Sequence, residues 1–228
     1  GSAPRGRKAM NDELSELYGV QPIGSSQRVS LSKLGRVGLL QHGSFLSTFA
    51  HEDESAPVLR GKAVLERLLC RKLPKPAELG IDLVLPPPNP NATTRERFAE
   101  HSARPDCAGC HQAIDGIGFA FEDFDAVGRF RSEQAGKPID TSGHVTLDGQ
   151  ELTLASSVDL SRALVASQEL QICAARQLVR FAAGSDAPDV EADFVQQTRV
   201  LPASERGSLV GLLLAYVQGD WFARRSTP

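Results

Sequence analysis

The sequence lacks the features that mark several classes of protein. Its 228 residues carry a formal net charge of −3, so there is no basic surface field to attract nucleic acid. No apolar run approaches the length of about 18 residues that spans a membrane, and the longest candidate, LVGLLLAYV, covers only 209–217. We find no internal repeat. We therefore expect no nucleic-acid partner and no transmembrane segment.

Cysteine, methionine and tryptophan are scarce, with four, one and one residues respectively. The hydrophobic fraction of 41% nevertheless suffices for a packed core of one sizeable domain. The opening GSAPRG resembles an expression scar, so the lack of a targeting segment says nothing of the native compartment. We expect residues 1–10 to be a scar and linker, residues 11–228 to form a single domain, and the natural protein to be longer at its N-terminus.

Most periodic segments have the spacing of amphipathic helices. Within 57–71, Val64, Leu65, Leu68 and Leu69 share one stripe, with charged residues opposite. Apolar residues recur at similar steps along the whole C-terminal part, for which we expect helices at 159–182, 188–199 and 204–218 within a helical region at 159–225. These patterns predict a mainly α-helical fold.

The breaks between helices are equally marked. Prolines at 73–91 exclude helix and predict a stiff, extended strap. A helix is expected from about Thr93, because Thr93 and Glu96 match a capping box, and Pro105 suits the first turn of the next helix. The composition of residues 132–153 predicts loops and at most one small β-hairpin. The connections are therefore long and irregular.

Three of the nine cysteines and histidines fall in the pentapeptide CAGCH, at Cys107, Cys110 and His111. C-x-x-C-H is the attachment signature of haem c. Two thiols about one helical turn apart reach the porphyrin vinyl groups as thioethers, and the adjoining imidazole becomes the proximal iron ligand. The pattern predicts one covalent haem c per chain.

Other chemistry remains open for this pentapeptide. A zinc site normally needs a second ligand pair, and Cys70 and Cys173 stand far apart. A thioredoxin-like dithiol prefers a βαβ context, which is not apparent here. A buried structural pair of cysteines and chance are the remaining alternatives.

The residues after the motif favour haem. Phe119, Phe121 and Phe124, with Phe130 close behind, are expected to form an apolar wall for the porphyrin. Arg129 and Arg131 are candidate partners for the haem propionates, since buried carboxylates need compensation. Ordinary core packing for the phenylalanines and a solvated surface position for the arginines remain alternatives. The candidate haem region thus spans residues 93–131.

The stretch RPDCAGCHQAIDGIGFAFEDFDAVGRFR resembles the pattern of the planctomycete-type cytochrome c family. Segments in the same order resemble that family on both sides, including RVGLLQHGSFL at 36–46 and the terminal 208–225. Gly116 and Phe121 depart from the family's usual proline and leucine. The resemblance implies a helical cytochrome c-like domain with haem c, a location in the periplasm or cell envelope, and further domains in the same protein.

A second axial iron ligand is harder to assign. The only methionine, Met10, lies beside the terminus, so thioether ligation is not expected. His42, in the apolar GLLQHGSFL, ranks first and matches a position that is often histidine in the family. His51, in a charged run, ranks second, and an open coordination position is also possible. His101 and His144 rank lower: the first precedes Cys107 closely, and the second lies in a glycine-rich loop that we expect to be solvated.

The two other cysteines, Cys70 and Cys173, fall near the apolar stripes of expected helices. Because haem c is attached in an oxidising compartment, two spare thiols there tend to pair. We predict a Cys70–Cys173 disulfide, with two buried free cysteines as the alternative.

Three functions follow in order of preference. The first is a monohaem electron-transfer module, whose partner is a redox protein or another domain of the same protein. The second is a haem oxidase or peroxidase with an open distal face, in which His42 or His51 acts as a base. The third is a structural domain without bound haem.

Overall fold

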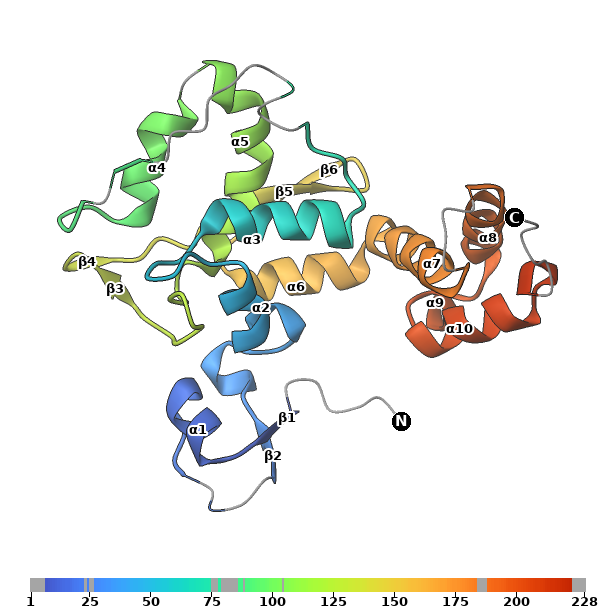
Figure 1. Cartoon of the computed structure of the whole chain (residues 1–228), viewed down its shortest axis with the longest axis horizontal. Helices are drawn as coiled ribbons and strands as arrows, with labels where there is room; N and C mark the ends of the chain where they lie inside the picture. Colours follow the sequence, from blue (N-terminus) through green and yellow to red (C-terminus); the bar gives the residue numbers. More distant parts are fainter. Residues whose placement is uncertain are drawn as a thin grey trace. The chain divides into compact units, whose positions relative to one another are not determined.

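A computed structural model gives the fold and describes residues 7–22, 24, 27–74, 78, 86–87, 89–103, 105–183 and 188–222 (Figure 1). Over these residues the chain is mainly α-helical, as the sequence predicts, and its strands form three two-stranded antiparallel sheets. Most of the proline-rich strap expected at 73–91 lies outside the described residues. In the described part of the chain, no helix is both long and apolar enough to cross a membrane.

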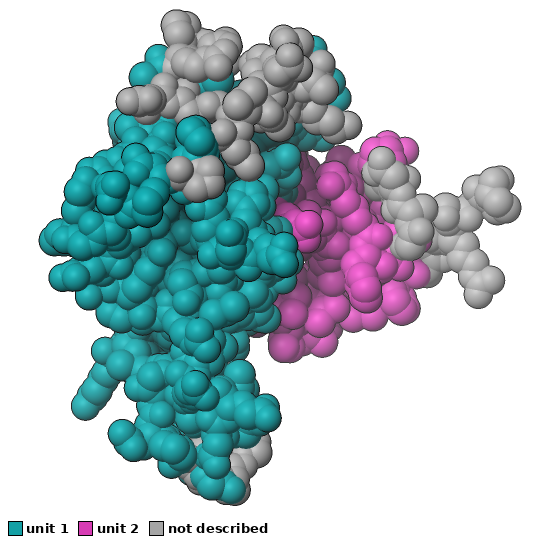
Figure 2. Space-filling view, turned by 60° about the vertical axis from the view of Figure 1, so that its left-hand side comes forward, with its two compact units in different colours: residues 1–66, 71–163 teal, residues 67–70, 164–228 magenta. Residues whose placement is uncertain are grey.

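The chain divides into two compact units (Figure 2). Unit 1 comprises residues 1–66 and 71–163, and unit 2 comprises residues 67–70 and 164–228. The single domain expected over residues 11–228 stays a prediction, because division into compact units does not test cooperative folding.

Unit 1 begins with two short paired strands that are joined by a segment containing one helix. Strand β1 (Arg7–Met10) pairs antiparallel with β2 (Gln27–Ser30), and α1 (Asp12–Tyr18) lies between them in sequence. Asn11 caps α1 by accepting a hydrogen bond from the Leu14 amide. Residues 7–10, which we expected to belong to a linker, therefore form a paired strand.

Short helices lead from these strands to the centre of unit 1. They are η1 (Ser32–Leu34), η2 (Leu39–Gln41), α2 (Gly43–Thr48) and α3 (Pro57–Ala63). The helix expected at 57–71 continues from α3 as a π-helical turn, η3 (Val64–Leu68). It ends where Cys70 takes a left-handed conformation, with φ of 51°, and the Arg71 amide donates to the Leu65 carbonyl. Three residues of the expected stripe are buried: Val64, Leu65 and Leu69.

A helical hairpin carries the CAGCH motif. Helix α4 (Thr94–Ser102) starts with the expected capping box, in which the Thr93 amide donates to Glu96 and the Glu96 amide donates to Thr93 Oγ1. Helix α5 (Pro105–Gly118) begins at the expected proline and packs against α3 (Figure 1). It leads directly into η5 (Phe119–Phe121).

Two hairpins follow, where the sequence suggested one. Strands β3 (Glu133–Gln134) and β4 (Lys137–Pro138) form the first, and β5 (Gly143–Leu147) and β6 (Gln150–Leu154) form the second. The β5–β6 turn is Asp148–Gly149, and both residues have positive φ, as a two-residue turn between twisted strands requires. Helix α6 (Ser157–Ala166) comes next.

Unit 2 is a helical cluster. Its elements are α7 (Gln168–Ala183), α8 (Pro188–Val200), α9 (Ala203–Arg206), α10 (Leu209–Gln218) and η6 (Asp220–Phe222). The helix expected at 159–182 is two helices, because Ser167 accepts a hydrogen bond from the Leu170 amide and starts α7 as its cap. The core includes Leu178, Phe194 and Tyr216. Phe181, which lies within the helix expected at 159–182, is 87% exposed.

Candidate functional site

The two cysteines of the pentapeptide lie in the first turns of α5. Cys107 is buried and Cys110 is half-buried, and both are free thiols. Their spacing of three residues on a continuous helix places them within about one turn of each other. The helix therefore provides the arrangement of thiols that a C-x-x-C-H motif requires.

His111 is held by a carboxylate one turn further along α5. Its Nδ1 atom lies 3.0 Å from Oδ1 of Asp115, whose residue is only 9% exposed. The other carboxylate oxygen accepts a hydrogen bond from the Ser102 hydroxyl on α4. Such a contact fixes the orientation and the tautomer of an imidazole, as a carboxylate does behind metal-bound histidines.

A cavity of about 360 Å³ lies beside His111. One face of α5 forms much of its wall, through Ala108, His111, Gln112, Asp115 and Gly116, and Phe119 at the start of η5 continues it. Arg95 of α4 also lines it, with its guanidinium carbon 4.3 Å from the centre of the Phe119 ring. The cavity thus combines an imidazole, an aromatic ring and a cation.

The opposite wall is formed by β5, which approaches α5 closely. Gly143 and His144 line the cavity there. A Cβ atom on Gly116 would overlap the His144 carbonyl oxygen and lie 3.2 Å from its imidazole Nε2. His144 is half-buried in a strand, in contrast to the solvated glycine-rich loop that we expected. The glycine at position 116 therefore lets the strand and the helix meet.

The phenylalanines expected to form a haem wall fall into two groups. Phe119 lines the cavity beside His111. Phe121 and Phe124 are fully buried and do not belong to that lining; Phe121 packs against Phe45 at a centroid distance of 5.8 Å. Arg60, also buried, donates to the carbonyl oxygens of both residues. The chain segment after η5 is therefore organised around a buried guanidinium.

Neither arginine expected to bind propionates lines the cavity beside His111. Arg129 is exposed and lines a different cavity. Arg131 pairs with the buried carboxylate of Glu122, with Nη2 and Oε2 separated by 3.1 Å. Burial raises the pKa of Glu122, while Arg131 and Arg60 oppose that rise.

The structure does not bring the two highest-ranked histidines, His42 and His51, to this cavity either. His42 is the N-cap residue of α2, and the adjoining Gly43 packs near Leu17 and Val127. The His51 amide donates to the Glu54 carbonyl in the following turn. Neither side chain lines the cavity beside His111. No cluster of three or more metal-ligating side chains forms in the described part of the chain.

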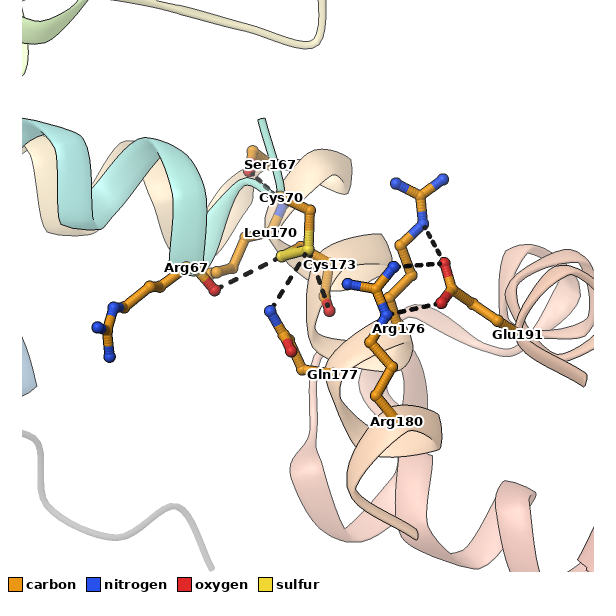
Figure 3. The surroundings of a disulfide bond; sticks show 9 residues. All are labelled: Arg67, Cys70, Ser167, Leu170, Cys173, Arg176, Gln177, Arg180 and Glu191. Carbon is orange, nitrogen blue, oxygen red and sulfur yellow. Dashed lines mark hydrogen bonds and ion pairs between the residues drawn. A yellow bond between two sulfur atoms is a disulfide. The ribbon is translucent and has the colours of Figure 1, made fainter. Parts of the chain in front are cut away.

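The expected disulfide is present in unit 2. Cys70 and Cys173 are bonded, with Cα atoms 5.4 Å apart (Figure 3). Gln177 lies beside the Cys70 sulfur, and Glu191 pairs with both Arg176 and Arg180 nearby. The bond is consistent with an extracytoplasmic location, because disulfides persist in oxidising compartments.

We did not expect Asp115 or Arg95 in the site from the sequence, and His144 ranked low. Asp115 carried a detectable signal, since a carboxylate four positions after a histidine shares its helix face. Arg95 and His144 gave none, because their places depend on the tertiary packing of α4 and β5 against α5.

Comparison with known proteins places this region in context. A family model described as PSCyt3, a protein of unknown function (DUF1588), matches residues 36–134. No curated protein and no solved structure matches the chain. Over the range that holds the CAGCH helix, the chain is thus similar to a family whose label points to a cytochrome-related domain and whose description assigns no function.

Proposed function

We propose that the chain is a monohaem c-type cytochrome module that transfers single electrons in the cell envelope as part of a larger protein. The observation that carries the proposal is the contact between His111 and Asp115 on the CAGCH helix, next to a cavity. An isolated zinc or redox cysteine pair has no need of an oriented imidazole at this position. A haem-ligating histidine does, because the carboxylate sets its tautomer and orientation.

The residues of α5 fit this group. Cys107 and Cys110 would hold it through thioethers, and His111 would coordinate the iron through Nε2, since Nδ1 contacts Asp115. Haem supplies a one-electron couple whose potential depends on ligands and burial. Phe119 excludes water from one side of the cavity, and Arg95 provides a cation there for a propionate.

The burial of Cys107 adds a constraint on how attachment would proceed. Cys107 is only 6% exposed, so its sulfur is poorly accessible in the folded chain. Thioether formation at this position would therefore precede the final packing of α5. This order is compatible with attachment to an unfolded, newly exported chain in an oxidising compartment.

The decisive test is expression with haem-attachment machinery. We expect the mass of the purified polypeptide to rise by one haem under denaturing conditions, with a pyridine haemochrome spectrum of the two-thioether type. Cys107→Ala combined with Cys110→Ala should abolish the added mass. The matched control is Cys70→Ala combined with Cys173→Ala, which removes the same number of cysteines and should retain it.

Two results would contradict the proposal. One is a chain that stays free of covalent haem although a known cytochrome c is loaded in the same cells. The other is haem that survives the change at both Cys107 and Cys110.

A further inference from the structure

A second cavity of unit 1 has no part in the site above. It has a volume of about 540 Å³ and lies among α1, η1 and the segment at 129–130. Its apolar wall is formed by Leu17, Tyr18, Leu34 and Phe130. Phe130 is 61% exposed and Leu34 is 39% exposed, so apolar surface is presented at its mouth. A volume of this size is typical of sites for small molecules.

The charged residues of this cavity are mostly cationic. Lys33, Arg36 and Arg129 face a single carboxylate, Glu16. Glu16, Lys33 and Arg129 are exposed, whereas Arg36 is only 1% exposed. The cavity therefore has a surplus of positive charge on otherwise apolar walls.

Arg36 is the unusual member of this set. Its Nη1 and Nη2 atoms donate to the carbonyl oxygens of Gln41 and Gly128, but Nε has no hydrogen-bond partner within the described structure. Its guanidinium forms no ion pair within 4.0 Å among the described residues and is stacked over the rings of Tyr18 and Phe124, while the carboxylates of Asp123 and Asp125 act on it from a greater distance. A buried cation without a close counter-ion is costly, and an anion near it would recover part of that cost.

We propose that this cavity binds a small amphipathic carboxylate, with its chain or ring against Leu34 and Phe130 and its carboxylate toward the three cations. The apolar walls account for the body of such a ligand, and Arg36, Lys33 and Arg129 account for its charge. A neutral lipid or alcohol leaves the cations uncompensated, and a bare inorganic anion leaves the apolar mouth exposed. The site is separate from the cavity beside His111, and the proposal does not depend on haem.

Binding is tested by calorimetric titration of the purified chain with octanoate and with 4-phenylbutyrate. Octanamide and 4-phenylbutyramide serve as neutral probes of matching shape. We expect at least one of the two carboxylates to bind with a dissociation constant below about 1 mM, and its amide to bind at least about tenfold more weakly.

Charge-neutralising variants then locate the site. Lys33→Gln and Arg129→Gln should each weaken binding by roughly three- to tenfold, because each removes a cation at the mouth. Glu16→Gln should strengthen it, because it removes the one opposing charge. Arg28→Gln, on strand β2 and outside the cavity lining, is the matched control and should leave binding unchanged.

Three results would overturn the proposal. The first is the absence of binding by both carboxylates below about 1 mM. The second is equal affinity for a carboxylate and its amide, which would indicate apolar adsorption alone. The third is an equal loss of affinity in Arg28→Gln and Arg129→Gln, which would indicate attraction to net charge and no defined cavity.

Discussion

Asp115 Oδ1 lies 3.0 Å from Nδ1 of His111, and both side chains are almost wholly buried on the same face of α5. The carboxylate itself is held by Ser102, so its position is fixed from a second helix. The contact links the protein's own hydrogen bonding to the electron density that His111 would donate to iron.

Asp115→Asn should raise the reduction potential of the haem-loaded protein. An imidazole that loses its carboxylate partner becomes a weaker donor, and the ferric state loses more stabilisation than the ferrous state. We expect a rise on the order of 50 mV, since 59 mV corresponds to a tenfold change in a one-electron equilibrium. Spectroelectrochemical titration measures it. Asp53→Asn, the same change of charge at an exposed residue, should leave the potential nearly unchanged.

Gly116→Ala should destabilise the chain, by about 1–3 kcal/mol, because its new methyl group overlaps β5 at His144. Gly109→Ala is the matched control on the same helix, where nothing lies within 4 Å of the added Cβ. That change should stabilise by up to about 1 kcal/mol through helix propensity. Urea unfolding followed by circular dichroism compares them. Equal effects at the two glycines would contradict the close approach.

The thiols of the haem-free chain should react with iodoacetamide in a fixed order. Cys110 should be alkylated first, and Cys107 about tenfold or more slowly, because it becomes accessible only through local opening. Cys70 and Cys173 should stay unmodified without reductant. Peptide mass spectrometry over a time course reads all four sites. Equal rates at Cys107 and Cys110 would show that α5 does not bury the first sulfur.

Removing the disulfide should cost stability to an extent that depends on the residue placed at 70. The bond closes a sequence separation of 103 residues, which corresponds to about 4–5 kcal/mol in the chain-entropy model and less in practice. Cys70 has a φ of 51°, a conformation that glycine adopts freely. In a Cys173→Ala background, Cys70→Gly should therefore be about 1 kcal/mol more stable than Cys70→Ala. Chemical unfolding compares the pair, and a more stable alanine variant would contradict this backbone argument.

Asp123→Asn should make the chain more stable than the wild type, by an amount that grows as the pH rises. Burial raises the pKa of Asp123 from 3.8 to about 6. In the wild type, stability is therefore lost as pH rises from the unfolded pKa to the folded pKa, and the loss is constant above it. The difference between the unfolded and folded pKa values corresponds to about 3 kcal/mol of unfolding free energy.

The variant lacks this titration, so its stability relative to wild type should increase between pH 4 and pH 7. Urea unfolding at both values measures the change, and Asp53→Asn controls for net charge. A constant difference between the Asp123 variant and the wild type at the two pH values would contradict a buried, titrating carboxyl.

Local sequence signals predicted the helices around the motif well. Two local signals act within one turn of their own position: the capping box at Thr93 and Glu96, and the proline at 105. Neighbouring residues alone therefore determine where these two helices begin. The disulfide was also predicted correctly, from the number of cysteines and the expected compartment.

The residues that line the cavity beside His111 could not be predicted from local sequence signals. His42 ranked above His144 because its sequence neighbours are apolar, yet side-chain placement depends on which elements pack together. Contact between β5 and α5 requires glycines at 116 and 143 on both surfaces. One glycine in a sequence does not reveal its partner. Phe121 and Phe124 show the same limit, because the carbonyl groups of both residues bind Arg60, about sixty positions away.

The bond between Cys70 and Cys173 also makes the intervening chain a covalent ring. The ring holds CAGCH, the proline-rich segment and the elements that line the cavity beside His111, which are α4, α5, η5 and β5. A protease that cuts once within 71–172 therefore releases no fragment until the sulfurs are reduced. Any haem carried by α5 would stay tethered to the rest of the polypeptide after such a nick.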